Sequence, residues 1–143
     1  MTVRELLDLK GREVFSIEGH KTVEDAIRLM DGRKISAMLV TEHGRPVGIF
    51  TERDVLRCYL SKEGAPFKKV ILKDIMTSDL IVAEPDEELC TVMTVMIEGG
   101  IRHLPVVEAG KIAGMLSIRD IVKTQVGNLR AELHHLKDYI SGM

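Results

Sequence analysis

Short apolar runs alternate with amphipathic segments along this chain, and the alternation occurs in two rounds. Apolar residues at helical spacing predict helices, whereas short apolar runs bounded by turn residues predict strands. In the first round, the expected elements are a helix at 3–9, a strand at 14–17, a helix at 22–33, hairpin strands at 37–41 and 46–50, and a helix that ends near 61. A stretch with Gly, Pro and lysines, residues 62–70, indicates a linker, and the same order of elements follows it.

The second round repeats the first at an offset of 66 residues, which becomes 69 upstream of Val14. The stretch Gly48–Val55 recurs as Gly114–Ile121, and each copy has a Gly, two apolar residues, a hydroxyl residue, any residue, Arg, Asp and an aliphatic residue. This pattern predicts an apolar strand that turns into a helix, where unpaired backbone N–H groups, a hydroxyl and a carboxylate lie together. Each junction is therefore a candidate binding site for a polar ligand.

Two copies of strand, helix, strand, strand and helix predict an α/β protein with two similar lobes, each too small to bury its apolar faces alone. We expect the two β-α-β-β-α repeats to be related by a pseudo-twofold axis and to be followed by a C-terminal amphipathic helix. The expected boundaries are 1–61 for the first repeat, 62–70 for the linker, 71–124 for the second repeat and 125–143 for the C-terminal helix.

The C-terminal segment carries an apolar stripe at alternating spacings of four and three residues, which is the pattern of a and d positions in a coiled coil. A helix with such a stripe needs a partner, either the chain's own lobes or a second subunit. Because fewer than three heptads are marginal alone, we favour self-association within a larger contact, and therefore a homodimer. The stripe consists of Val122, Val126, Leu129, Leu133, Leu136 and Ile140.

Composition narrows the classes of function. The 143 residues have a net charge of −2, with Lys and Arg spread along the chain, so no basic face for nucleic acid is indicated. No apolar run approaches the roughly 20 residues of a membrane span, and residues 1–10 carry charges where a signal peptide would be apolar. These features indicate a cytoplasmic protein without a membrane partner. We also expect no metal site and no catalytic residues, because neither a metal-ligand pattern nor a nucleophile paired with a base is present.

Several motifs recur in order in both halves of the chain. The first helix contains Val-x-x-Ala-Ile-x-x-Met at 23–30, residues 101–107 read Ile-Arg-His-Leu-Pro-Val-Val, and both copies have Gly-x-x-Thr/Ser-x-x-Asp. With these motifs, about residues 1–124 resemble a tandem pair of cystathionine β-synthase (CBS) domains, called a Bateman module. The whole chain is similar to small stand-alone bacterial proteins with a CBS pair.

The resemblance implies a sensor that binds an adenosine-containing ligand in clefts between the repeats. The ligand would be AMP, ADP, ATP, NAD or S-adenosylmethionine, acting as a regulatory ligand, and no cofactor would be obligatory. In the family, the Asp of the motif accepts hydrogen bonds from the ribose and the hydroxyl residue assists, roles that carry over to Thr51 with Asp54 and to Ser117 with Asp120. The segment that enters the middle strand would surround the adenine, with Ile35, Ser36, Ala37 and Met38 in the first repeat and Ile101, His103, Leu104 and Pro105 in the second.

Positive side chains and helix N-termini are the candidates for binding phosphate. They are Arg53, Arg119, Arg102, His103 and Lys21, together with Thr22 at the start of a helix. The second repeat has Glu88 at the position of Thr22, where a carboxylate would repel a phosphate. Because Arg102 and His103 have uncharged counterparts in the first repeat, we expect the two clefts to be inequivalent.

Each hydroxyl and Asp pair also matches a helix capping box, and capping alone would explain one such motif. The leading hypothesis is nevertheless a non-catalytic regulatory module that signals by conformational change and acts on an enzyme or transporter in trans. The alternative is a ligand-free interaction protein that dimerises and recruits a partner through its C-terminal helix.

Overall fold

The two repeats contribute to two compact units that exchange their N-terminal segments. The computed structural model describes residues 1–142. Unit 1 comprises Met1–Arg12 together with Ala83–Met143, and unit 2 comprises Glu13–Val82. The beginning of the chain therefore folds with the second repeat, and the segment that leads into the second repeat folds with the first.

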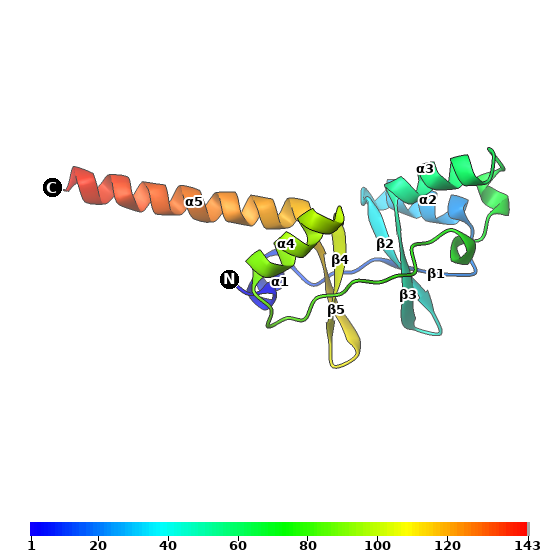
Figure 1. Cartoon of the computed structure of the whole chain (residues 1–143), viewed down its shortest axis with the longest axis horizontal. Coiled ribbons are helices and arrows are strands. Elements are labelled where there is room, and N and C mark those ends of the chain that lie inside the picture. The colour runs from blue at the N-terminus through cyan, green and yellow to red at the C-terminus, as the bar shows by residue number, and fades with distance from the viewer. Residues whose placement is uncertain (143) are drawn as a thin grey trace. The chain divides into compact units, whose positions relative to one another are not determined.

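Unit 2 contains a three-stranded sheet in the order β1-β2-β3. Its elements are β1 (Ser16–Glu18), α2 (Val23–Arg33), β2 (Ala37–Glu42), β3 (Arg45–Thr51), α3 (Glu52–Ser61) and the 3₁₀ turns η1 (Phe67–Lys69) and η2 (Leu72–Asp74). β1 runs parallel to β2, and β2 runs antiparallel to β3. α2 and α3 cover one face of this sheet (Figure 1). The buried core between them consists of Ile17, Val23, Ala26, Met30, Met38, Val40, Phe50, Cys58, Val70 and Leu72.

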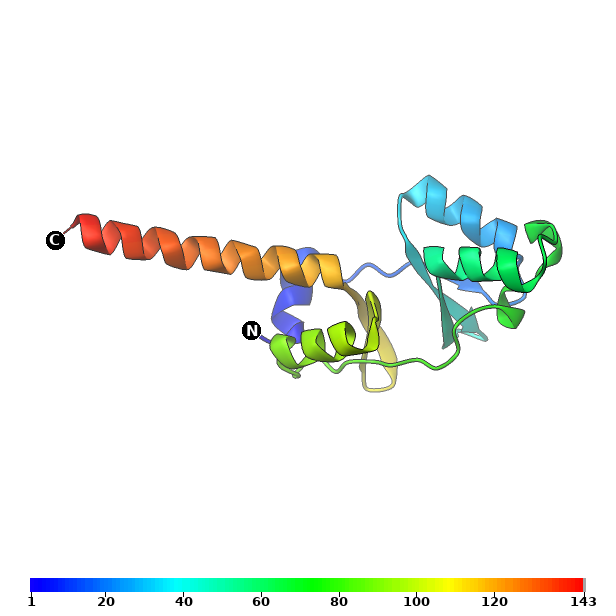
Figure 2. The ribbon, with the colours of Figure 1, turned by 45° about the horizontal axis from the view of Figure 1, so that its top comes forward.

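Unit 1 is built around an antiparallel hairpin of two strands. Its elements are α1 (Val3–Lys10), α4 (Leu89–Gly99), β4 (His103–Glu108), β5 (Lys111–Ser117) and α5 (Ile118–Ser141). α1, from the start of the chain, lies beside α4 and the base of α5 (Figure 2). The buried core consists of Val3, Leu6, Leu7, Ala83, Leu89, Val92, Met96, Leu104, Val106, Leu116 and Ile121.

The predicted α/β fold class is confirmed, and most predicted elements lie within a residue or two of their expected positions. The predicted cap of α2 is also present, since Thr22 Oγ1 accepts a hydrogen bond from the N–H of Asp25 and the Asp25 carboxylate accepts one from the N–H of Thr22. The strand expected at 14–17 is displaced and occupies 16–18.

The first strand of the second repeat is the element that differs most from expectation, because it shrinks to a single parallel bridge at Ala83. In unit 2, the N–H groups of Gly19 and Leu39 extend the pairing of β1 with β2 through hydrogen bonds of 2.9 and 3.0 Å. Pro85 and Pro105 stand 66 residues further on, and proline has no N–H to donate. Both outer hydrogen bonds are therefore impossible in the second repeat.

The exchanged segments attach to the two units in the same way. Residues 70–73 bind unit 2 through three backbone hydrogen bonds, and residues 1–4 bind unit 1 through the three equivalent ones, all between 2.8 and 3.1 Å. Val3 and Leu72 are the matching apolar residues of the two segments, and neither side chain is exposed. Each unit thus owes part of its core to a segment that the sequence assigns to the other repeat.

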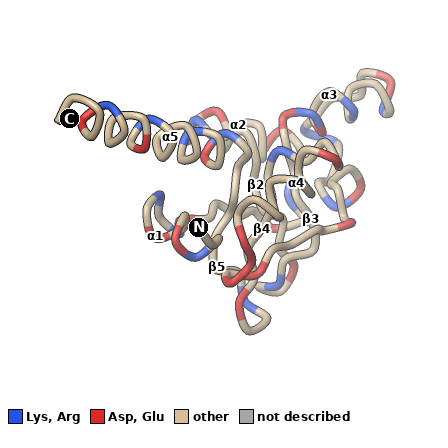
Figure 3. Tube along the Cα trace, turned by 60° about the vertical axis from the view of Figure 1, so that its left-hand side comes forward, with Lys and Arg blue, Asp and Glu red and all other residues tan. Residues whose placement is uncertain are grey.

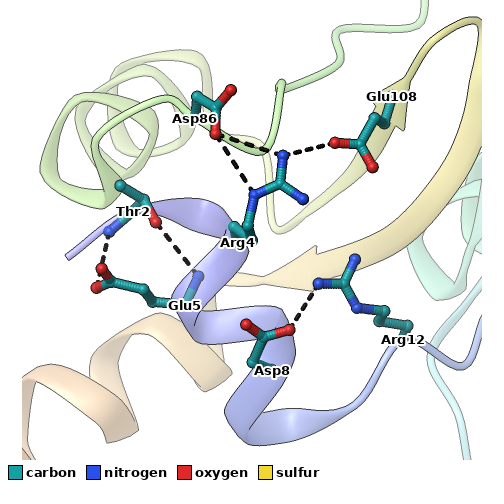
Figure 4. Close-up of polar contacts among 7 residues, drawn as sticks. All are labelled: Thr2, Arg4, Glu5, Asp8, Arg12, Asp86 and Glu108. Atoms are coloured by element: carbon teal, nitrogen blue, oxygen red, sulfur yellow. Dashed lines mark hydrogen bonds and ion pairs between the residues drawn. The ribbon is translucent and has the colours of Figure 1, made fainter.

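Charged side chains add to this attachment in unit 1. Arg4 of α1 pairs with Asp86, at 3.4 Å, and with Glu108 at the end of β4 (Figure 4). Thr2 and Glu5 form a reciprocal capping box at the start of the same helix. α1 is therefore fixed in place by its cap and its ion pairs as well as by its buried leucines.

Two glycines allow the exchanged segments to lie close to the sheets. A Cβ atom on Gly48 would lie 2.5 Å from the sulfur of Met76 and 2.9 Å from the carbonyl oxygen of Thr77. The three atoms nearest to a Cβ atom on Gly114 would all belong to the side chain of Leu7, with the closest carbon at 2.7 Å. The glycine at the start of each motif thus has a packing role that the sequence pattern alone does not reveal.

We expect Gly48→Ala to lower the free energy of unfolding by about 2–3 kcal/mol, because the backbone at Thr77 must move to accommodate the methyl group. Gly114→Ala is the matched control, and we expect a smaller loss of roughly 1 kcal/mol, since a leucine side chain can rotate more easily than a backbone can shift. Urea denaturation of both variants measures the difference. Equal losses would contradict this account of Gly48.

The C-terminal helix is continuous with the last helix of the second repeat. The segment predicted as the C-terminal helix, residues 125–143, is part of α5, which runs without a break from Ile118 through Gly127 to Ser141. Residue 143 lies outside the described residues. Within residues 1–142, no helix combines the length and the apolar character that crossing a membrane requires.

Candidate functional site: two strand-to-helix junctions

Both Gly-to-Asp stretches form the strand-to-helix junctions that the sequence predicts. β3 passes into α3 at Thr51, and β5 passes into α5 at Ser117. Thr51 Oγ1 accepts a hydrogen bond from the N–H of Asp54, at 3.4 Å, and Ser117 Oγ accepts one from the N–H of Asp120, at 3.1 Å. Each copy thus holds a hydroxyl and a carboxylate at a helix N-terminus, where the helix dipole stabilises negative charge.

The carboxylate of Asp54 is fully engaged inside unit 2. Its Oδ2 accepts hydrogen bonds from the N–H and the hydroxyl of Thr51, at 2.9 and 3.3 Å. Its Oδ1 accepts one from the Thr77 hydroxyl, at 3.2 Å, and lies 3.0 Å from Nη2 of Arg57. The Asp54 side chain is 4% exposed. In this state Asp54 holds the start of α3 to the segment that leads out of unit 2.

The carboxylate of Asp120 is more accessible. Its side chain is 37% exposed, and its Oδ2 lies 3.1 Å from Nζ of Lys10, which comes from the end of α1. Burial raises the pKa of this carboxyl group, but hydrogen bonds with Ser117 and Lys10 and the positive charges of Lys10 and Lys123 outweigh burial and leave the pKa below its ordinary value. Asp120 is therefore ionised at neutral pH and open to solvent on one side.

The structure brings the entry of the middle strand next to each junction. Ala37 pairs with Thr51 across β2 and β3, and His103 pairs with Ser117 across β4 and β5. The residue before each pair also binds the first residue of the following helix. The carbonyl of Ser36 accepts a hydrogen bond from the N–H of Glu52, at 3.1 Å, and the carbonyl of Arg102 accepts one from the N–H of Ile118, at 2.9 Å. Segments that are predicted to contact one ligand are thus neighbours in each unit.

The apolar residues predicted to surround adenine differ in exposure. Met38 and Leu104 are each 1% exposed and belong to the cores of their units. Pro105 is also buried, whereas Ile35 and Ile101 are partly exposed and pack against those cores. Their contact with adenine stays a prediction, and the partly exposed isoleucines are the better placed to make it.

The predicted phosphate-binding arginines are available at the surface. Arg53 and Arg119 lie in the first turns of α3 and α5, Arg102 lies just before β4, and all three are exposed. None of them forms an ion pair with another residue in the range 1–142. Over that same range, no three His, Cys, Asp or Glu side chains gather as metal ligands would.

The remaining candidates lie at the start of the first helix of each repeat. Thr22 is the N-cap of α2 and Lys21 before it is exposed. Glu88 is the N-cap of α4 but caps it with no side-chain hydrogen bond, and its Oε2 lies 3.5 Å from the N-terminal amine of Met1. The two repeats therefore differ at this position, since a neutral threonine caps the helix in the first and a carboxylate without a capping hydrogen bond stands in the second.

Unit 2 also has a pocket that the sequence motifs did not indicate. Its volume is about 340 Å³, within the range of small-molecule sites. One lining residue, Met38, was among the predicted ligand residues, and it follows the pair of Ala37 with Thr51. Arg33 lies over the ring of Phe15 at 4.7 Å, a pairing between distant residues that no local pattern signals. The lining residues are Glu13, Val14, Phe15, Ser16, Leu29, Arg33 and Met38.

Comparison with known proteins agrees with this architecture. The chain is 36% identical over 126 residues to the mitochondrial CBS domain-containing protein CBSX3 of Arabidopsis thaliana. The matched region covers 85% of this chain and 61% of that protein. The chain thus spans about half to two thirds of the length of the first curated relatives that it matches.

Several solved structures match this chain over nearly the whole length of both chains. The CBS-domain containing protein ATU1752 from Agrobacterium tumefaciens is 33% identical with a TM-score of 0.83, over 87% of this chain and 99% of that one. The CBS domain pair of protein MJ0100, in complex with 5′-methylthioadenosine and S-adenosyl-L-methionine, has the same fold, with a TM-score of 0.77 and 23% identity over 90% of this chain and 98% of that one.

The family model of the CBS domain matches the chain twice, at residues 3–61 and 72–127. The two matches fall on the two repeats and include both strand-to-helix junctions. The chain therefore belongs to the CBS-domain family and carries a tandem CBS pair, which is a regulatory module.

Proposed function

We propose that the protein is a non-catalytic regulatory module that binds an adenosine-containing ligand at its strand-to-helix junctions. The observation that carries this proposal is the same hydroxyl and carboxylate pair at the start of α3 and of α5. An ionised carboxylate only accepts hydrogen bonds, so it suits the two hydroxyl donors of a ribose. The adenosine compounds bound to the MJ0100 pair support the proposal at the level of the fold.

Asp120 is the carboxylate that we propose binds ribose more readily. Its side chain is 37% exposed, against 4% for Asp54, so a ligand reaches it with less rearrangement. Arg102 and Arg119 are exposed in the same unit and supply positive charge for a phosphate. AMP, ADP, ATP or NAD would use these arginines, whereas S-adenosylmethionine, which has no phosphate, would leave them unused.

Ligand binding would change the conformation by competing for the carboxylates. Thr77 donates to Asp54 and lies five residues before the end of unit 2, and Lys10 pairs with Asp120 just before the chain leaves unit 1. A ribose that takes over either carboxylate displaces the group that now holds it. The connecting segment held by that group, after Lys10 or after Thr77, is then released, and we propose that this release is the signal.

Isothermal titration calorimetry with AMP, ADP, ATP, NAD and S-adenosylmethionine tests the proposal. We expect at least one ligand to bind, and Asp120→Ala to weaken its binding about tenfold or more. Asp138→Ala is the control, because Asp138 is an exposed carboxylate of the same helix that lies far along the chain from the junction. Absence of binding by every ligand would contradict the proposed function, and equal losses in both variants would contradict the role of Asp120.

The exposed apolar stripe on α5 favours a second candidate function. In that case the repeats bind no ligand, and α5 recruits another protein. Nucleotide binding that depends on Asp120 would argue against this alternative. Under the leading proposal, the protein acts in the cytoplasm as a homodimer and regulates an enzyme or a transporter in trans.

A further inference from the structure

α5 extends beyond the core of unit 1 with its apolar stripe exposed. Ile121 is its last buried residue, and the exposed fractions of Leu129, Leu133, Leu136 and Ile140 lie between 53% and 67%. From Val122 to Ile140 the helix is about 28 Å long at 1.5 Å per residue. Most of the stability of a helix in a protein comes from packing of its apolar face, so this exposed stripe calls for a partner.

The charges that flank the stripe indicate which partner fits. In heptad terms, Val126, Leu133 and Ile140 are a positions, and Val122, Leu129 and Leu136 are d positions. The e positions are then Lys123, Arg130 and Lys137, all basic, and the g positions are Gln125, Glu132 and Tyr139. Figure 3 shows charges of both signs along α5. Within residues 1–142, neither Glu132 nor these three basic side chains form an ion pair, so they are available to a partner.

Parallel and antiparallel pairing of two copies place these charges differently. In a parallel, in-register pair, each g residue faces the e residue of the next heptad, so Glu132 meets Lys137 of the second copy twice by symmetry. In the antiparallel alignment that matches Leu129 with Leu133, Glu132 faces Glu132 and Arg130 faces Arg130. Like charges on both flanks oppose that arrangement.

We infer that the α5 helices of two copies form a parallel, in-register coiled coil between Val122 and Ile140. The inference rests on the proposed homodimer and specifies its orientation. Fewer than three heptads give a weak contact alone, so the dimer dissociates on dilution unless other surfaces contribute.

Sedimentation velocity of the full chain over a range of concentrations tests the pairing. We expect a reversible dimer that Glu132→Lys weakens about tenfold or more, because each attractive pair becomes a repulsive one. Glu132→Lys combined with Lys137→Glu exchanges the two charges and should restore the dimer. A chain that is monomeric throughout, or a double variant as weak as the single one, would overturn the inference.

Cysteine cross-linking tests the orientation. In a Cys90→Ser background, where the remaining Cys58 is buried, we expect Ile140→Cys to form a disulfide dimer under mild oxidation. Cross-linking only after Val122→Cys and Ile140→Cys chains are mixed would overturn the parallel arrangement. Calorimetry separates this inference from the ligand proposal: a monomer that binds nucleotide contradicts only the coiled coil, and a parallel dimer that binds none contradicts only the ligand.

Discussion

Deletion of residues 1–12 should unfold unit 1, which contains the second repeat, although the deletion lies entirely in the sequence of the first. α1 places Val3, Leu6 and Leu7 in the core of unit 1, each no more than 1% exposed. Removal of a buried leucine costs about 2–5 kcal/mol, so the loss of the two leucines alone amounts to roughly 4–10 kcal/mol. This is comparable with the whole stability of a small domain, about 5–15 kcal/mol.

Hydrogen exchange measured by mass spectrometry locates this effect. Peptides from residues 83–121 should lose protection, whereas peptides from residues 16–61 should keep most of theirs, because none of the deleted residues belongs to the core of unit 2. Protection that falls first in residues 16–61 would contradict the exchange of segments.

Point variants of α1 provide a milder form of the same test. Leu7→Ala should lower the free energy of unfolding by about 3 kcal/mol, since the side chain is fully buried. Leu9→Ala is the matched control on the same helix, with a side chain that is 70% exposed, and should change the free energy by less than about 0.5 kcal/mol.

The second large effect is expected at Asp54, where we predict that Asp54→Ala lowers the free energy of unfolding by about 2–4 kcal/mol. The substitution leaves the N–H of Thr51 and the hydroxyl of Thr77 without their acceptor and removes one half of the capping box of α3. Arg57 also loses its carboxylate partner, but its side chain is 54% exposed and water can replace the partner.

Asp120→Ala is the matched control, because Asp120 holds the equivalent position in the other junction. Its ion pair with Lys10 is partly exposed, and we expect its loss to cost about 1 kcal/mol or less. Urea denaturation at neutral pH measures both variants. If Asp120→Ala proved as destabilising as Asp54→Ala, the difference that we infer between the two carboxylates would be wrong.

Much of the fold could be predicted because the patterns that define it are local. Thr22, Thr51 and Ser117 each have the spacing of a helix cap, and each caps a helix in the structure. The hairpins follow from apolar runs on both sides of short turns. The first strand of the second repeat, which is reduced to a bridge at Ala83, shows the limit of this reasoning. The two copies share one pattern, but two prolines in the second copy remove hydrogen bonds that the first copy forms.

The residue types of the candidate site were predictable from the sequence, but the burial and the partners of its carboxylates were not. The two Gly-to-Asp motifs are nearly identical in sequence, yet one carboxylate is buried and the other is accessible. The partners that cause this difference, Thr77 and Lys10, lie outside the motifs and reach them from distant segments. The same is true of Arg33 and Phe15 in the pocket of unit 2.

The sequence by itself determined the duplication, the order of the elements, the hydroxyl and carboxylate at each junction and the heptad stripe of α5, since each depends on spacing along one segment. Only the tertiary structure decided that residues 1–12 complete the core of the second repeat and that residues 70–82 complete that of the first. It also decided which carboxylate is buried and which is accessible to solvent. The physical reason is that burial and partner choice depend on contacts between segments far apart in the chain, and no local spacing encodes them.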